Sequence, residues 1–151
     1  MSPGVRRDDC IFCRIVAGES PCEAIWEDDA TLAFMDINPA NVGHCLVIPK
    51  AHFASLFEIP PAAFGAVAAT AAKVAVAVEA ELRPGGLSLV QANGTVAGQS
   101  VFHLHLHVLP RREGDDLRLN WDRNRPAGGH RDRAEIAAIA GRLRARLGAE
   151  G

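Results

Sequence analysis

The sequence has no excess of charge of either sign and no segment typical of export or membrane insertion. The 16 Lys and Arg residues stand against 18 Asp and Glu, for a formal net charge of -2. Nucleic acids and anionic membranes select strongly basic surfaces, so we expect neither as a partner. Residues 1–9 lack the apolar run of a secretory signal, and the alanine-rich uncharged stretch of residues 59–72 is shorter than the ~18 apolar residues of a membrane span. These absences lead us to expect a cytoplasmic protein.

Internal repeats, low-complexity linkers and the common phosphate-binding glycine motifs are also missing. No G-x-x-x-x-G-K-[ST] sequence occurs, and no G-x-G-x-x-G follows a predicted strand. If a phosphate binds to this protein, side chains must therefore supply the chemistry. A length of 151 residues without a linker indicates one domain, large enough to bury a core.

Residues 102–108 alternate apolar and polar side chains without a break, which predicts a half-buried strand. Its apolar side chains are expected to face a core: Phe102, Leu104, Leu106 and Val108. The other face then carries three histidines about 6.5–7 Å apart, His103, His105 and His107. A single histidine on a strand is usually structural, but three at period two beside a Gly-Gln-Ser turn indicate a functional site.

Three strand histidines can act together in two ways. His103 and His107 would lie ~13 Å apart, too far to bind one metal ion with nitrogens ~2.0–2.1 Å away. Either His103 and His105 share a metal, or the three divide structural, reactive and orienting roles among them. A neutral imidazole is available near pH 7 as a nucleophile or base. Gln99 and Ser100 in the preceding turn offer hydrogen-bond donors for phosphate oxygens.

The four cysteines do not have the spacing of a disulfide framework. Cys10 and Cys13 form a C-x-x-C pair, whereas Cys22 and Cys45 are isolated. In a reducing compartment such a pair usually binds a metal or acts in redox chemistry. The βαβ context of a thioredoxin-like motif is missing, which leaves a metal site or two free thiols.

The remaining patterns predict an α+β fold in a single domain. Residues 1–9 are expected to be disordered, and residues 10–17 to form a short helical turn. Residues 61–82 form the main helix, with a proline in its first turn and apolar residues at three- and four-residue steps, and a last helix spans about residues 131–147. The predicted strands are residues 23–26, 31–36, 44–49, 87–91 and 102–109. Short links between them favour a five-stranded antiparallel sheet packed against the main helix.

Five blocks of the sequence resemble the histidine triad (HIT) family of nucleotide hydrolases and transferases. The family signature is matched by A-G-Q-S-V-F-H-L-H-L-H-V-L at residues 97–109. The upstream blocks are C-I-F-C-R-I at 10–15, W-E-D-D at 26–29, L-A-F-M-D-I at 32–37 and G-H-C-L-V-I-P-K-A-H at 43–52. The resemblance implies a HIT domain over residues 10–116, followed by a C-terminal loop and helix over residues 117–151.

The resemblance also implies covalent catalysis at the middle histidine. His105 would attack the α-phosphorus of a purine nucleoside phosphoramidate or related nucleotide conjugate, and water would then hydrolyse the nucleotidyl-histidine. His107 would fix the geometry of the site. Ser100 would donate to the bridging or leaving atom, and Gln99 would stabilise the phosphoryl oxygens.

The same resemblance implies which residues hold the purine nucleotide. Asp36 would accept hydrogen bonds from the ribose hydroxyls. The base would be bordered by three apolar side chains, Ile11, Phe34 and Ile37. Asn93 and His44 would lie near the phosphate or the leaving group.

For the C-x-x-C pair, the resemblance implies a structural zinc ion. The implied ligands are Cys10, Cys13, His52 and His103. A closed set of two cysteines and two histidines leaves no open position for catalysis, and it removes His103 from the reaction.

Other interpretations stay open from the sequence. Residues 111–115, R-R-E-G-D, resemble the branch of the family that cleaves dinucleoside polyphosphates. A zinc-dependent hydrolase could instead use His103 and His105 to hold a catalytic zinc that activates water. A third interpretation is a nucleotide-binding module without turnover. The alanine-rich main helix and the family resemblance both favour a homodimer. The two copies would be joined through this helix and an adjacent strand.

Overall fold

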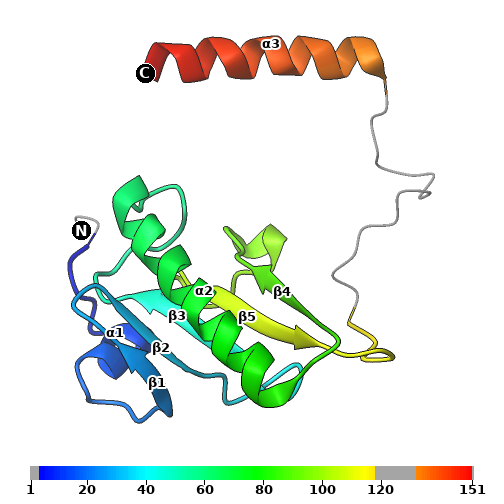
Figure 1. Ribbon diagram of the computed structural model, residues 1–151. Coiled ribbons are helices and arrows are strands. Elements are labelled where there is room, and N and C mark those ends of the chain that lie inside the picture. Colours follow the sequence, from blue (N-terminus) through cyan, green and yellow to red (C-terminus); the bar gives the residue numbers. More distant parts are fainter. Residues whose placement is uncertain (1–3, 118–131, 151) are drawn as a thin grey trace. The chain divides into compact units, whose positions relative to one another are not determined.

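The chain folds into two units, which are described separately. The structure is a computed structural model, and it describes residues 4–117 and 132–150 (Figure 1). The first unit, Met1–Asp116, contains a β-sheet and the helices α1 and α2. The second, Leu117–Gly151, contains the helix α3 (Arg133–Glu150). The predicted start of this last helix, residue 131, lies outside the described residues.

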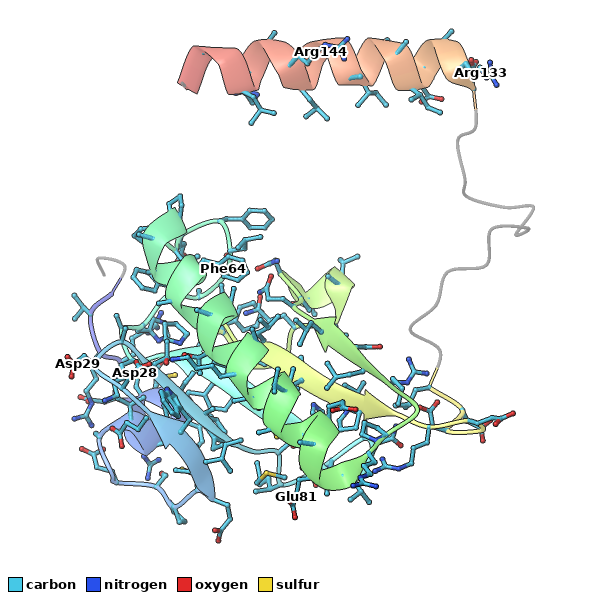
Figure 2. The ribbon with its side chains drawn as sticks, in the orientation of Figure 1. Asp28, Asp29, Phe64, Glu81, Arg133 and Arg144 are labelled. Atoms are coloured by element: carbon cyan, nitrogen blue, oxygen red, sulfur yellow. The ribbon has the colours of Figure 1, made fainter. Side chains whose placement is uncertain are left out.

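The first unit has the predicted α+β architecture, with a five-stranded antiparallel sheet. The strands are β1 (Ala24–Glu27), β2 (Thr31–Met35), β3 (Cys45–Pro49), β4 (Gly86–Val90) and β5 (Leu106–Arg111). Their order across the sheet is β1-β2-β3-β5-β4. The β1–β2 hairpin turns at Asp28, labelled in Figure 2, whose Oδ1 accepts hydrogen bonds from the backbone N–H groups of Ala30 and Thr31 at 2.9 and 2.7 Å. Such an aspartate-centred turn explains why two short strands separated by Asp28-Asp29 pair as a hairpin.

Helix α2 (Pro61–Leu82), which has the predicted bounds, packs along one face of the sheet. Its buried apolar side chains share a core with the strands: Val67, Ala71, Val74 and Val78 pack with Ala33, Val47 and Val108. By length and composition alone α2 could cross a membrane. Its packing against the sheet makes it the core helix of this unit.

Side-chain alternation along β2 and β3 gives the sheet a second buried face. Ala33 and Val47 contribute to the core under α2, whereas their neighbours belong to a separate cluster: Leu32, Phe34, Leu46 and Ile48. Phe12 of α1 (Ile11–Val16) completes this second cluster. The candidate site forms on this face, opposite α2.

Residues 102–105 depart from the predicted strand. β5 begins at Leu106 rather than at residue 102, and Phe102 is 50% exposed instead of packed in the core. The N–H of Leu104 bonds to the carbonyl oxygen of Phe53 in a loop at 2.7 Å, and not to a neighbouring strand. Because the backbone pairs with a loop here, the apolar–polar alternation of the sequence continues without a regular strand.

Residues 4–9, part of the segment 1–9 that was expected to be disordered, have partners in the folded domain. Gly4 pairs with His52 in an isolated β-bridge. The N–H of Arg7 donates to Sγ of Cys13 at 3.4 Å, and the Arg6 guanidinium lies 2.6 Å from the Glu19 carboxylate. Polar composition alone did not reveal that these residues have partners in the folded domain. Residues 1–3 lie outside the described part of the chain.

Candidate active site and metal-binding cluster

A cavity of about 570 Å³ opens on the face of the sheet opposite α2. Its wall combines α1, the end of β2 and the segment that leads into β5. The predicted site residues that line it are Ile11, Phe34, Asp36, Ile37, Ser100, His105 and His107. The fold therefore brings the predicted base-binding, ribose-binding and reactive residues to one cavity.

His105 is held in one tautomer. Its Nδ1 lies 2.8 Å from the carbonyl oxygen of His103. A carbonyl oxygen can only accept, so Nδ1 carries the proton and Nε2 of the neutral ring has a free lone pair. Burial lowers the pKa of His105, which favours this neutral form at physiological pH. The ring can therefore act as a nucleophile at Nε2.

A second chain of hydrogen bonds orients His107. The N–H of Ala40 donates to Nδ1 of His44 at 3.1 Å, so the proton of a neutral His44 ring is on Nε2. That Nε2 lies 2.9 Å from Nδ1 of His107, which must accept. The proton of His107 is then on Nε2, where it can be donated to a ligand. Burial is the main cause that lowers the pKa of His107, to about 4, so both rings are neutral near pH 7.

Asp36 lies at the end of β2 and closes this network. Its Oδ1 accepts a hydrogen bond from the N–H of Asn38 at 2.8 Å, and its Oδ2 lies 3.6 Å from Nε2 of His44. Although Asp36, His44 and His107 are close enough to hold a metal ion, the hydrogen bonds account for their arrangement. Asp36 lines the cavity, where its carboxylate can accept a hydrogen bond from a ribose hydroxyl.

The Gln99 and Asn93 side chains have partners within the protein. The Gln99 carboxamide donates from Nε2 to the carbonyl oxygens of Ala54 and Val101 at 2.6 and 3.1 Å, and its Oε1 accepts from the N–H of Gly94 at 2.8 Å. The side-chain oxygen of Asn93 accepts from the N–H of Leu56 at 2.7 Å. These bonds fasten the loop before Ser100. The stabilisation of phosphoryl oxygens by Gln99, and the place of Asn93 near the phosphate or leaving group, stay predictions.

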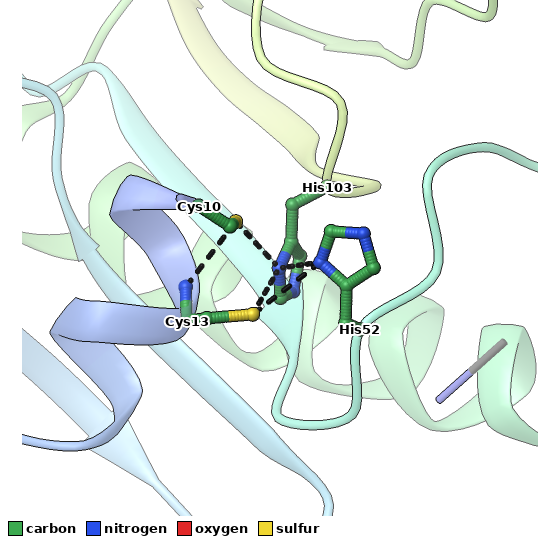
Figure 3. A group of neighbouring side chains, drawn as sticks. All are labelled: Cys10, Cys13, His52 and His103. Carbon is green, nitrogen blue, oxygen red and sulfur yellow. Dashed lines mark hydrogen bonds between the residues drawn. The ribbon is translucent and has the colours of Figure 1, made fainter. Parts of the chain in front are cut away.

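Next to the cavity, the four residues predicted as zinc ligands converge (Figure 3). Nδ1 of His103 lies 3.4 Å from Sγ of Cys10 and 3.6 Å from Sγ of Cys13. Nδ1 of His52 lies 3.3 Å from Sγ of Cys13 and 3.2 Å from Nδ1 of His103. A tetrahedral zinc with usual bond lengths places its ligand atoms about 3.3–3.8 Å apart. The geometry and the donor types therefore fit a zinc ion.

The protonation of His103 also fits a metal ligand. Its Nε2 lies 2.8 Å from the carbonyl oxygen of Pro49, so Nε2 carries the proton and Nδ1 faces the sulfurs with a free lone pair. His105 is not a member of this cluster. The interpretation in which His103 and His105 share one catalytic zinc therefore does not fit, because His103 points to the cysteines and His105 to the cavity.

Comparison with known proteins agrees with the fold and with this arrangement. The HIT domain pattern matches residues 17–114. This chain belongs to the HIT family. Adenylylsulfatase HINT3 of Arabidopsis thaliana is 40% identical over 111 residues, which cover 74% of this chain and 56% of that protein. The chain thus spans little more than half the length of this relative. Adenosine 5'-monophosphoramidase hnt1 of Schizosaccharomyces pombe is 38% identical over 113 residues, 74% of this chain and 82% of that protein.

Solved structures of HIT proteins have the same fold. A HIT family protein from Bacillus anthracis superposes with a TM-score of 0.78 at 36% identity, over 90% of this chain and 97% of that one. A zinc-bound histidine triad family protein from Mycobacterium smegmatis superposes with a TM-score of 0.70 at 37% identity, over 95% and 98% of the two chains. A HIT protein with bound zinc is therefore among the structural neighbours of this chain.

The sequence analysis missed two residues of α1 at the site. Phe12 and Ile15 line the cavity, and the Phe12 ring lies edge-on to the His105 ring with a centroid distance of 5.3 Å. A signal for them existed, because Ile11 and Ile15 are four residues apart on a short helix and Phe12 lies inside the C-x-x-C motif.

Proposed function

We propose that this protein hydrolyses purine nucleoside phosphoramidates or related nucleotide conjugates at the α-phosphorus, through a covalent nucleotidyl-His105 intermediate. The observation that carries the proposal is the 2.8 Å contact between Nδ1 of His105 and the carbonyl oxygen of His103, which leaves Nε2 free in the cavity. The names of the two relatives, adenylylsulfatase and adenosine 5'-monophosphoramidase, support this class of substrate.

In the first step, the lone pair on Nε2 of His105 forms a bond to the α-phosphorus while the bond from phosphorus to the leaving nitrogen breaks. The leaving nitrogen keeps the electron pair and takes up one proton from solvent, which the attacking water returns in the second step. Ser100, on the cavity wall, donates a hydrogen bond to this atom. In the second step, water attacks the phosphorus, loses one proton and releases His105. The cycle conserves protons and yields a nucleoside monophosphate and an amine.

The other cavity residues stabilise the charge and hold the substrate. His107, with its proton on Nε2, donates to a non-bridging phosphoryl oxygen as negative charge develops there. Asp36 accepts from the ribose hydroxyls. Phe34, Ile11 and the 86% exposed Ile37 provide apolar surface for the purine. An exposed isoleucine beside a cavity is explained by a ligand that covers it.

Replacing the nucleophile tests the mechanism. We expect His105→Ala to reduce turnover of an adenosine phosphoramidate by roughly 10³-fold or more, because no other cavity side chain offers a comparable lone pair. The variant should still bind adenosine monophosphate, which calorimetry would measure. In the unaltered protein, quenching without acid followed by mass spectrometry should detect a nucleotidyl adduct on His105. Full activity of the variant would exclude this mechanism.

The same assay decides the substrate class. We expect adenosine phosphoramidates to be hydrolysed faster than diadenosine polyphosphates. The reverse order would assign the protein to the dinucleoside-polyphosphate branch, and binding of adenosine monophosphate without hydrolysis of either class would indicate a binding module.

We also propose that Cys10, Cys13, His52 and His103 hold one structural zinc ion per chain, that the protein is a homodimer and that it is cytoplasmic. The zinc proposal is supported by the ligand distances and by the zinc-bound relative. The dimer proposal is supported by exposed apolar side chains on α2 and on the edge strand β4, where Val76 and Leu89 are 70% and 51% exposed. Zinc in this closed site would hold the fold together, and the reaction would use His105 and its neighbours.

A further inference from the structure

Helix α1 belongs to both sites of the protein. Its N-cap residue, Cys10, and its third residue, Cys13, place their sulfurs in the metal-binding cluster. The residues between and after them line the nucleotide cavity: Ile11, Phe12 and Ile15. Any movement of α1 therefore changes the metal ligands and the cavity wall together.

Apart from the metal-binding cluster, α1 is held to the sheet by apolar packing and not by backbone hydrogen bonds. The helix has six residues, and isolated helices shorter than ~12–15 residues are marginal in water. In the described part of the chain, its backbone hydrogen bonds stay between residues 7 and 20. The remaining attachments are apolar packing and one bridge. Phe12 belongs to the second core cluster, and Ile15 and Val16 pack against it. Gly4, upstream of the helix, pairs with His52, which is itself a residue of the metal-binding cluster.

The cluster also touches the nucleophile directly. His103 offers Nδ1 to the cluster, donates from Nε2 to Pro49, and accepts the Nδ1 proton of His105 at its own carbonyl oxygen. Phe12 bridges the two rings, with centroid distances of 5.8 Å to His103 and 5.3 Å to His105, both edge-on. The position of the His103 side chain is thus linked to the position of the reactive ring.

Without a metal ion, the four donor atoms of the cluster have only weak hydrogen bonds to one another. The thiols of Cys10 and Cys13 can donate to Nδ1 of His103 and Nδ1 of His52, at 3.4 and 3.3 Å, but a thiol is a weak donor. The two Nδ1 atoms lie 3.2 Å apart. A cation satisfies all four donor atoms at once, so ordering of α1 follows from filling the cluster.

From these contacts we propose that α1 is a metal-anchored wall of the nucleotide pocket, so that zinc and nucleotide bind cooperatively. This inference rests on the proposed nucleotide site. When the cluster is filled, α1 is ordered before the nucleotide arrives, and the nucleotide does not bear the cost of ordering it. Linkage requires the converse, so bound nucleotide raises the affinity for zinc by the same factor.

Competition for zinc in the complete protein tests the coupling. The zinc affinity of the protein is measured at equilibrium against a chromogenic chelator, without nucleotide and with saturating adenosine monophosphate. We expect adenosine monophosphate to tighten zinc binding at least about fivefold, within the usual range of coupling between sites. Calorimetry should show adenosine monophosphate binding weaker by the same factor after zinc removal.

A pair of variants identifies α1 as the link, even if the zinc-free protein fails to fold. Phe12→Leu keeps all four ligands but removes the ring that bridges His103 and His105. This variant should bind zinc, and the factor by which adenosine monophosphate tightens zinc binding should fall to about one. The matched control is Phe64→Leu, on α2 in the other core (Figure 2), which should keep the full effect.

Two results would overturn the inference: zinc affinity that is the same with and without adenosine monophosphate, or full coupling in Phe12→Leu. Failure of the zinc-loaded protein to bind adenosine monophosphate would instead contradict the proposed function, and the coupling with it.

Discussion

Three imidazoles around the cavity, those of His44, His105 and His107, have their protons placed by neighbouring backbone groups. The N–H of Ala40 and the carbonyl of His103 are the fixed ends of the two chains of hydrogen bonds. Burial is the largest influence on each ring and lowers its pKa. The result is a nucleophile with a free Nε2 and a neighbour that donates from Nε2, both without net charge.

This arrangement predicts the acid limb of the pH profile. Protonation of His105 removes its lone pair, so activity falls as the pH is lowered, and a lowered pKa moves that fall to lower pH. We expect kcat to stay near its maximum through pH 6.5, the ordinary pKa of histidine, and to decline below it. A midpoint of the decline at or above pH 6.5 in stopped-time assays would contradict the assignment.

The variant Asp36→Asn tests whether these histidines control the acid limb of the pH profile. The Asp36 carboxylate raises the pKa of His44, His105 and His107, partly offsetting burial. Its removal should shift the acid limb of kcat to still lower pH, in addition to raising KM through loss of the ribose contact. A shift to higher pH would show that another group controls the profile.

At the scale of elements, loops and turns position the site residues, and the sheet supports these loops and turns. The loop before Ser100 is fastened by the Gln99 carboxamide, and the turn before β3 must deliver His44 to the network. Gly43 makes this turn possible because its φ is +90°, and a Cβ there would lie 2.3 Å from Cδ1 of Leu82 and 3.2 Å from Cγ of Pro110. The close approach of α2 to this turn therefore depends on a residue without a side chain.

Gly43→Ala should lower the free energy of unfolding by about 1–3 kcal/mol, because alanine is strained at this φ and crowds Leu82. The matched control is Gly65→Ala inside α2, where an added Cβ meets nothing within 4 Å. That change should be neutral or stabilise by about 0.5–1 kcal/mol through helix propensity. Urea unfolding curves of the two variants give the comparison, and equal effects would disprove the role of Gly43.

For the whole molecule, the proposals of a homodimer and of one zinc per chain are open to a single measurement. Native mass spectrometry should show a species of twice the 16.1 kDa chain mass with two zinc ions. Exposed apolar side chains on α2 and β4 give the physical reason for association, because burying them removes apolar surface from water. A monomer at micromolar concentration, or a dimer without zinc, would contradict the corresponding proposal.

Much of this molecule followed from residue patterns. The α+β class, the bounds of α2 and the membership of the HIT family were predicted, because periodicity and motif spacing are properties of the chain itself. The strand predicted over residues 102–109 was wrong at residues 102–105. Alternation of apolar and polar residues indicates which side chains are buried, but not which backbone groups pair. The partners of residues 4–9 could not be found from the sequence, because residues such as His52 are distant along the chain.

The sequence by itself determined which side chains were available for chemistry: a C-x-x-C pair, three histidines at period two, and an aspartate after a strand. Only the tertiary structure decided what each of them does. The carbonyl oxygens of Pro49 and His103 determine the tautomers, and the carboxamide of Gln99 bonds to backbone groups. Every residue carries a carbonyl group, so its effect depends on where the fold brings it.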